Sequence, residues 1–352
     1  MSTYSSTDDV RIKRLRPLIP PAILLEEVPI TPELQAFVGA QRKAAGAVVS
    51  GADKRLLVVV GPCSIHDPKA AVEYAGRLKQ AADRYADDLL IVMRTYFEKP
   101  RTTVGWKGLI NDPDLDNSFA INRGLRVARE LLLELLKVGV PTGTEFLDPI
   151  SPQFVADLVC WGAIGARTSE SQVHRELASG LSMPVGFKNG TGGSVSIAVD
   201  AIRASRFPHQ FLSVTKQGLA AIVETSGNEH THLILRGGGG KPNYDSASVE
   251  QASEALRKAG VSEGLMVDCS HDNSGKDHTR QPLVVADLAA QIERGNRSIM
   301  GVMIESFIVA GKQAVAPRPQ LTFGQSITDA CLGWEDTLPV LEALAQAARK
   351  RR

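Results

Sequence analysis

Eight short apolar runs, separated by longer segments with helical periodicity, constrain the fold more than any other feature of this sequence. The runs are nearly continuous in apolar residues, which is typical of strands buried on both faces. Strands that alternate with helices form a parallel sheet covered by helices. The predicted strands are Leu56–Val60, Leu89–Arg94, Pro141–Glu145, Ala163–Arg167, Pro184–Lys188, His232–Arg236, Leu265–Asp268 and Ser298–Glu305. Eight such units predict an α/β fold of the closed (β/α)8 type, a TIM barrel.

Capping signals mark where the intervening helices begin and end. Asp67 before Pro68 is typical of an N-cap followed by proline at the first helical position. A second helix is predicted to open at Ser118 and to stop at Gly139, because glycine is the preferred residue just past a helix end. The last helix is predicted to begin at Glu335.

Three segments fall outside this alternation. Residues 1–54 hold a proline cluster and a predicted helix from Pro32 to about Val49, so we expect an extension docked on its own subunit or on a neighbour, with the barrel spanning 55–352. Two strand-like runs, Phe211–Val214 and Leu219–Thr225, predict a β-hairpin inserted at about 211–225. The basic residues 349–352 are expected to form a solvated tail.

The composition excludes several classes of function. A formal net charge of +1 gives no electrostatic case for a nucleic-acid or membrane partner. Only 5% of the residues are aromatic, which leaves few side chains on which the bases of a polynucleotide could stack. No apolar run approaches the roughly 18–20 residues that span a bilayer, and the N-terminus lacks the apolar core of a secretory signal. The four cysteines are widely spaced, which predicts reduced thiols in a cytoplasmic protein.

Each predicted strand ends in, or runs within a few residues into, a chemically capable side chain. In chain order these are Cys63, Arg94, Glu145, Arg167, Lys188, Arg236, Asp268 with His271, and Glu305. Because the carboxyl ends of all strands meet at one rim of a barrel, we expect these residues to form a single site. The alternative is that charged residues follow strands because loops are solvated. It does not explain strands that end directly on Lys188 or Arg236.

Cations dominate this predicted rim. The six are Arg94, Lys99, Arg101, Arg167, Lys188 and Arg236. Uncompensated cations repel one another, so we expect anions to occupy the site. Arginine matches phosphate and carboxylate with a planar fork, and lysine adds a mobile point charge. The set therefore predicts a small substrate with several negative charges, or two such substrates.

The other rim residues suggest a metal. Cys63, His271 and Glu305, with Asp329 beyond the eighth strand, offer a thiolate, an imidazole and two carboxylates. This donor set suits a divalent ion such as Mn, Fe, Co or Zn with an open position for substrate. Their spacing matches no short zinc motif. Taken alone, Cys63 is better explained as a buried thiol and His271 as a hydrogen-bonded loop histidine. Cys331 is expected near Cys63, so that oxidation without metal would couple the two thiols, whereas Cys160 and Cys269 are expected to pack in the core.

Long motifs resemble those of the type I (alpha subgroup) 3-deoxy-D-arabino-heptulosonate-7-phosphate (DAHP) synthases. They are Gly61–Asp67 (GPCSIHD), Lys99–Gly108 (KPRTTVGWKG), Gly165–Glu176 (GARTSESQVHRE), Gly186–Thr191 (GFKNGT) and Asp268–His271 (DCSH). The resemblance covers essentially the whole chain. It implies condensation of phosphoenolpyruvate with erythrose 4-phosphate, the first step of the shikimate pathway, in a metal-dependent homo-oligomer that is a dimer or a tetramer.

The resemblance also implies a role for each rim residue. It assigns Arg94, Lys99, Arg167, Lys188 and Arg236 to phosphoenolpyruvate, with Glu145 beside it, Arg101 and Thr102 to the sugar phosphate, and Cys63, His271, Glu305 and Asp329 to the metal. Lys99 is the candidate for proton transfer at the sugar oxygen. His174 is the candidate for a proton relay to the attacking water.

Members of this family are often inhibited by an aromatic amino acid. The matching positions are Asp8, Asp9, Pro152, Gln153, Ser182, Phe211, Ser213 and Val223. The N-terminal arm and the hairpin resemble the phenylalanine-sensitive members, whereas Pro149 resembles the tyrosine-sensitive ones, so the effector stays open. Dimer packing is an alternative use of the arm.

Two other functions remain alternatives. The sister enzyme that condenses phosphoenolpyruvate with arabinose 5-phosphate carries Lys-Ala-Asn-Arg-Ser-Ser where this chain has Lys99–Thr103 (KPRTT). A catalytically silent barrel that only binds metal and phosphate would be favoured by loss of a ligand or a rim cation, and all of them are present.

Overall fold

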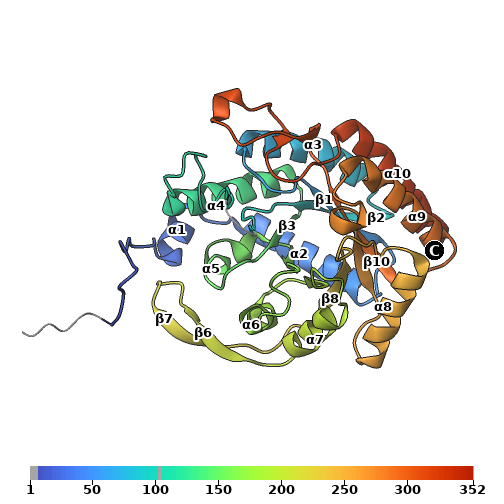
Figure 1. Ribbon diagram of the computed structural model, residues 1–352, viewed down its shortest axis with the longest axis horizontal. Helices are drawn as coiled ribbons and strands as arrows, with labels where there is room; N and C mark the ends of the chain where they lie inside the picture. The colour runs from blue at the N-terminus through green and yellow to red at the C-terminus, as the bar shows by residue number, and fades with distance from the viewer. Residues whose placement is uncertain (1–6, 102–104, 352) are drawn as a thin grey trace, which may run out of the picture.

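A closed barrel of eight parallel strands forms the centre of the structure, a computed structural model that describes residues 7–101 and 105–351 (Figure 1). The barrel strands are β1 (Leu56–Gly61), β2 (Leu89–Arg94), β3 (Thr142–Glu145), β4 (Trp161–Ile164), β5 (Val185–Lys188), β8 (Thr231–Leu235), β9 (Leu265–Asp268) and β10 (Ile299–Glu305). Strands adjacent in sequence are neighbours in the barrel, and β10 pairs with β1 to close it. The predicted TIM barrel is confirmed. The fourth strand is shorter than predicted, so Arg167 lies in the loop after β4.

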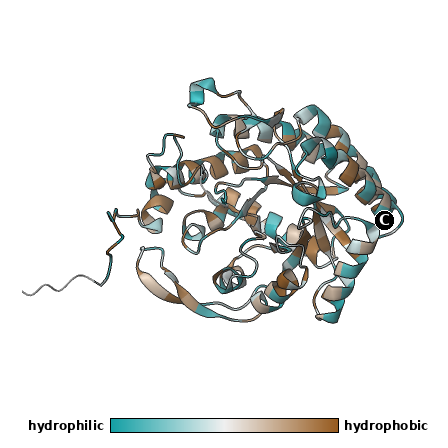
Figure 2. Ribbon diagram, viewed as in Figure 1, coloured by the Kyte–Doolittle hydropathy of each residue, from teal (hydrophilic) through white to brown (hydrophobic). Residues whose placement is uncertain are grey.

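Alternate residues of the strands serve two separate cores. In β1, Leu57 and Val59 belong to the cluster that fills the barrel, together with Trp161 and Met303. Their neighbours in the same strand pack outward against the helices. Both faces of each strand are therefore apolar, which explains the nearly continuous apolar runs in the sequence. Figure 2 shows the central strands mostly in brown, the colour of hydrophobic residues.

Helices surround the barrel and connect its strands (Figure 1). They are α3 (Pro68–Arg84), α4 (Ile121–Val138), α5 (Pro152–Val155), α6 (Gln172–Gly180), α7 (Ser196–Ser205), α8 (Ser246–Lys258), α9 (Gln281–Glu293) and α10 (Trp334–Arg351). Asp67 caps α3 by accepting a hydrogen bond from the Lys69 backbone N–H at 2.9 Å. Gly139 ends α4 with a φ of +88°, a left-handed conformation that glycine adopts without strain. Helix α4 begins at Ile121, three residues later than predicted.

The N-terminal extension closes one end of the barrel. It contains α1 (Pro21–Glu27) and α2 (Pro32–Val49). Ala45, Val48 and Val49 of α2 belong to the same apolar cluster as the barrel interior, and the Ser262 hydroxyl just before β9 donates to the Val49 carbonyl at 3.2 Å. The extension therefore docks on its own barrel, at the amino ends of the strands. Residues 7–18 before α1 are exposed and extend from the body (Figure 1).

Two strand pairs lie outside the barrel. Antiparallel β6 (Gln210–Val214) and β7 (Ala220–Glu224) form the predicted hairpin, and β11 (Val309–Lys312) pairs with β12 (Gln325–Ser326) after the last barrel strand. Among the described residues, no helix has both the length and the apolar character needed to cross a bilayer.

The C-terminal basic residues are helical and do not form a separate tail, although Arg349 and Lys350 are exposed. Residues 349–351 continue α10, and the Arg349 guanidinium is 2.6 Å from a carboxylate oxygen of Asp88. Arg351 donates to the carbonyl of Ile299, at the start of β10, at 2.6 Å. The predicted tail was wrong because these contacts come from segments distant in sequence. Arg352 lies outside the described residues.

Candidate active site

The carboxyl ends of the barrel strands carry the predicted rim residues. Arg94, Glu145, Lys188, Asp268 and Glu305 are each the last residue of a strand. A cavity of about 60 Å³ opens among these ends, lined by Cys63, Arg94, Tyr96, Lys99, Pro100, Glu145, Ala166, Arg167, Lys188, Thr191, Arg236 and His271. The structure thus brings together side chains that lie more than 200 positions apart in the sequence.

Four rim cations are paired with carboxylates of the same chain. The pairs are Arg94 with Glu305 (3.0 Å), Lys99 with Asp329 (2.8 Å), Lys188 with Asp268 (3.0 Å) and Arg236 with Asp272 (3.2 Å). The expectation of uncompensated cations was therefore wrong for these four. Closure of the barrel brings in counterions from other segments of the chain, which a local sequence pattern does not predict. Two of these partners, Glu305 and Asp329, are also predicted metal ligands. The predicted substrate cations are therefore in direct contact with the predicted metal ligands.

Arg94 is the most tightly held of these cations. Its Nε donates to the Pro62 carbonyl at 3.1 Å, and its guanidinium carbon lies 3.6 Å from the ring centroid of Tyr96. Such stacking favours the cation by about 0.5–2 kcal/mol. The Tyr96 hydroxyl is buried and has no hydrogen-bond partner among the described residues. Sequence analysis missed Tyr96. Its signal was the spacing of two from Arg94, which suggests the same side of an extended segment.

Three of the four predicted metal ligands form a compact group. One donor atom from each of Cys63, Glu305 and Asp329 lies within 4.8 Å of the other two. The Lys99 amino group lies among them, 2.9 Å from Cys63 Sγ and 2.8 Å from Asp329 Oδ2. Burial and then Glu305 raise the pKa of the Cys63 thiol to about 11. Burial alone would raise the pKa of Asp329 as well, but Lys99 holds it well below its usual value.

His271, the fourth predicted ligand, lines the same cavity but is not part of that compact group. Its Nδ1 lies 2.9 Å from the buried Asp268 carboxylate, which leaves Nε2 as its potential metal donor. A thiol and an imidazole that line the cavity, with two carboxylates close to the thiol, make a donor set that fits a first-row divalent ion.

Other predicted residues lie elsewhere. Arg101 is exposed and does not line the cavity, and Thr102 lies outside the described residues. Both ring nitrogens of His174 are engaged at 2.9 Å, Nδ1 with the Ser171 hydroxyl and Nε2 with the Leu147 carbonyl. His174 does not line the rim cavity, and the proton relay through it stays a prediction.

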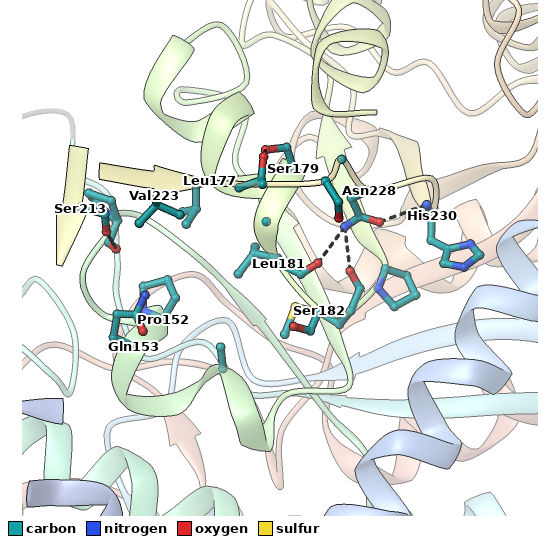
Figure 3. A pocket seen from close by; sticks show the side chains of 18 of the residues that line it. Pro152, Gln153, Leu177, Ser179, Leu181, Ser182, Ser213, Val223, Asn228 and His230 are labelled. Atoms are coloured by element: carbon teal, nitrogen blue, oxygen red, sulfur yellow. Dashed lines mark hydrogen bonds between the residues drawn. The ribbon is translucent and has the colours of Figure 1, made fainter. Parts of the chain in front are cut away.

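A larger cavity of about 930 Å³ lies between the hairpin, α5 and α6 (Figure 3). Its walls include six of the positions matched to the effector: Pro152, Gln153, Ser182, Phe211, Ser213 and Val223. Asp8 and Asp9, the other two, lie in the exposed N-terminal segment and do not line it. Lys216 in the hairpin turn donates to the Gln153 carbonyl at 2.6 Å, which ties the hairpin to α5.

Comparison with known proteins assigns the family. A model of the DAHP synthetase I family matches residues 28–342. This chain belongs to the DAHP synthetase I family. It is 57% identical to the Phe-sensitive phospho-2-dehydro-3-deoxyheptonate aldolase of Escherichia coli K12, over 98% of each chain. It is 54% identical to the tyrosine-inhibited enzyme of that name from Schizosaccharomyces pombe, over 98% of this chain and 94% of the other.

The fold of this family member agrees with a solved structure. The phospho-2-dehydro-3-deoxyheptonate aldolase of Francisella tularensis SCHU S4 superposes with a TM-score of 0.95 at 53% identity, over 97% of this chain and 99% of that one. The Phe-sensitive and tyrosine-inhibited relatives are almost equally similar, so overall identity does not separate the two kinds of effector.

Proposed function

We propose that this member of the DAHP synthetase I family condenses phosphoenolpyruvate with D-erythrose 4-phosphate and water, releasing phosphate and DAHP. The observation that carries the proposal is the convergence of Arg94, Arg167, Lys188 and Arg236 on one cavity beside a thiol and carboxylates. Four cations around a small cavity match a substrate that carries both a phosphate and a carboxylate. Binding at the carboxyl ends of the barrel strands holds that substrate on a rigid scaffold.

The cations also favour the chemical step. C3 of phosphoenolpyruvate forms a bond to the aldehyde carbon of the sugar phosphate, whose oxygen takes a proton, and water adds to C2. The adduct then loses phosphate by C–O cleavage, so negative charge develops on the leaving group. Guanidinium and ammonium groups already in place stabilise that charge without reorganising. The buried ion pairs at Arg94 and Lys188 hold these two cations in position.

Cys63, His271, Glu305 and Asp329 would hold the divalent metal, which we propose to be Mn, Fe, Co or Zn. When bound there, the ion would polarise the aldehyde oxygen of the sugar phosphate. Lys99 lies within 3 Å of two of these residues, so its ammonium group can deliver a proton from Nζ to the sugar oxygen. Glu145, at the end of β3 in the same cavity, is proposed to lie beside the attacking water.

The activity is tested by measuring phosphate release from phosphoenolpyruvate with each of two sugars. We expect turnover with erythrose 4-phosphate, none or little with arabinose 5-phosphate, and loss of turnover after chelation. Preference for arabinose 5-phosphate would instead support the sister enzyme. Binding of phosphoenolpyruvate without turnover on either sugar would support a silent barrel.

Replacement of Arg94 or Lys188 by Ala should lower kcat/KM by at least about a thousandfold, because each loses a charge-assisted contact to a developing anion. Steady-state kinetics of phosphate release measures the loss. Lys258→Ala is the matched control, since this lysine also pairs with a carboxylate at 2.8 Å but lies exposed on α8. Near-normal turnover of either rim variant would refute the assignment.

We further propose that an aromatic amino acid inhibits the enzyme from the cavity under the hairpin. The relatives' names include both Phe-sensitive and tyrosine-inhibited forms, and six of the matched positions line that cavity. Inhibition assays with phenylalanine, tyrosine and tryptophan identify the effector.

Phe211 and Val223 face inward, whereas Leu212 and Ile222 are 81% and 75% exposed, a surface that fits a homo-oligomer. All four cysteines are free, which fits a cytoplasmic enzyme.

A further inference from the structure

One carboxylate oxygen lies between the two halves of the site. Asp268, the last residue of β9, is fully buried, and its Oδ2 is 3.0 Å from Lys188 Nζ and 2.9 Å from His271 Nδ1. Its other oxygen accepts a hydrogen bond from the Ser270 backbone N–H at 2.9 Å. Neither contact of Oδ2 is aligned as a hydrogen bond, so this oxygen acts on both groups through its charge.

We propose that Asp268 is a positioning residue that couples metal binding at His271 to phosphoenolpyruvate binding at Lys188. The inference rests on the proposed function, since that function assigns Lys188 to the substrate and His271 to the metal. Asp268 itself does not line the cavity and would touch neither ligand.

On the metal side, Asp268 sets the orientation of the imidazole. Its Oδ2 occupies the Nδ1 side of the ring at 2.9 Å, so Nε2 is the nitrogen available to a metal. Carboxylates in this position orient a ligating histidine and raise its basicity, and their loss typically lowers metal affinity by 10–100-fold. The backbone also holds His271 in place: its φ is +53°, and its carbonyl accepts a hydrogen bond from the Lys276 N–H at 2.7 Å.

On the substrate side, Asp268 is the counterion of a lysine whose side chain is 5% exposed. A buried ammonium without a partner is costly, so Lys188 needs this carboxylate until a substrate anion takes its place. A metal ion bound at His271 would add positive charge to the imidazole, so Asp268 would interact more strongly with His271. Asp268 would then interact less strongly with Lys188, whose ammonium group could bind phosphoenolpyruvate more tightly. Because such coupling is reciprocal, each ligand should tighten the other by the same factor.

Asp272 provides a matched comparison. Its carboxylate pairs with Arg236, another proposed phosphoenolpyruvate cation, at 3.2 Å, and it too is largely buried. It differs in that the structure records no contact of this carboxylate with the imidazole of His271 or with Lys188 in the described residues. If only the loss of a negative charge near the site mattered, replacing either carboxylate would have the same effect on metal and substrate binding. The proposed coupling predicts an effect on both only when Asp268 is replaced.

The experiment compares the wild type, Asp268→Asn and Asp272→Asn without the second substrate. Mn²⁺ affinity is measured from the electron paramagnetic resonance signal of the free ion, and phosphoenolpyruvate affinity by calorimetry with and without Mn²⁺. We expect Asp268→Asn to lose about 10–100-fold in Mn²⁺ affinity and to abolish the tightening of phosphoenolpyruvate by Mn²⁺. Asp272→Asn should weaken phosphoenolpyruvate binding but keep both the Mn²⁺ affinity and the tightening.

Two outcomes overturn the proposal: unchanged Mn²⁺ affinity and tightening in Asp268→Asn, or equal loss of both in Asp272→Asn. If Asp268→Asn does not fold, the double variant Asp268→Asn/Lys188→Gln buries no unpaired ammonium and keeps the test available. It should show the same loss of Mn²⁺ affinity, and wild-type affinity would overturn the proposal. Neither readout needs turnover, so an enzyme that fails to make DAHP yet shows the coupling refutes only the proposed function.

Discussion

Buried charges at the rim are held by partners from strands on either side of a shared neighbour: β2 and β10 both flank β1, and β5 and β9 both flank β8. The guanidinium of Arg94 and the carboxylate of Glu305 are 2% and 0% exposed and lie 3.0 Å apart. Removing one member of such a pair leaves the other charge buried without water or a counterion, which lowers the free energy of unfolding by about 3–5 kcal/mol. Rim variants should therefore be judged by their unfolding temperature as well as by their activity. The same pairs hold the cations ready for substrate, which favours catalysis.

Peroxide should couple Cys63 to Cys331 in protein stripped of metal. The Cys63 backbone N–H is 3.3 Å from Cys331 Sγ, so the thiols are close, and their oxidation to a disulfide would reduce peroxide to water. The reaction should be slow at neutral pH, because burial raises the pKa of Cys63 to about 11. Thiol titration should show loss of both thiols, restored by dithiothreitol. Retention of both free thiols in inactivated protein, or the same loss in Cys331→Ser, would contradict this.

The hairpin shows how strand periodicity divides one element between two environments. Ser213 and Val223 line the large cavity (Figure 3), as does Phe211, while Leu212 is exposed on the opposite face of the strand. The Ser213 hydroxyl donates to the Pro149 carbonyl at 3.3 Å, which joins the hairpin to the loop after β3, the strand that ends on Glu145. The large cavity and the rim thus share a loop.

Phe211→Ala should relieve inhibition by the aromatic amino acid without changing the uninhibited rate. Loss of one aromatic wall removes contact worth about 1.4 kcal/mol or more, which corresponds to a tenfold higher inhibitor concentration at half-inhibition. Dose–response curves of phosphate release measure the shift. Leu212→Ala, on the other face of the same strand, is the control and should respond as the wild type does. Equal relief in both variants would place the effector elsewhere.

At the scale of the whole molecule, the N-terminal extension is part of the barrel's core. Val48 and Val49 of α2 pack in the same cluster as Leu57 and Met300. An open barrel end would expose that apolar interior to water, at about 25 cal/mol per Å². The segment before α1 makes no comparable contribution, since its side chains from residue 7 to residue 18 are exposed.

Truncation should separate these two parts of the extension. Deletion of residues 1–18 is expected to leave the thermal unfolding temperature within a few degrees of the full chain, whereas deletion of residues 1–50 should prevent folding because it uncovers the barrel interior. Calorimetry and circular dichroism measure both. A stable, cooperative protein without residues 1–50 would show that the barrel closes without α2.

Local chemistry in the sequence was enough to predict the eight-stranded barrel and the hairpin, because strand burial and helix capping depend on residues close along the chain. Asp67, Gly139 and the apolar run of β1 act within one turn or one strand. Most of the rim could be predicted as well, since parallel strands must all end on the same side of a barrel. Arg101, which was expected there, does not line the cavity, and Tyr96, which does, was not expected.

Only the tertiary structure decided how those rim residues pair. Arg94 meets Glu305 across 211 positions, and Asp268 meets Lys188, because the closure of the barrel sets these distances and no periodicity records them. The stacking of Tyr96 under Arg94 and the docking of α2 on the barrel have the same origin. Local sequence thus determined which elements form and where their ends lie, and long-range packing decided which charge neutralises which, since that depends on distances through space.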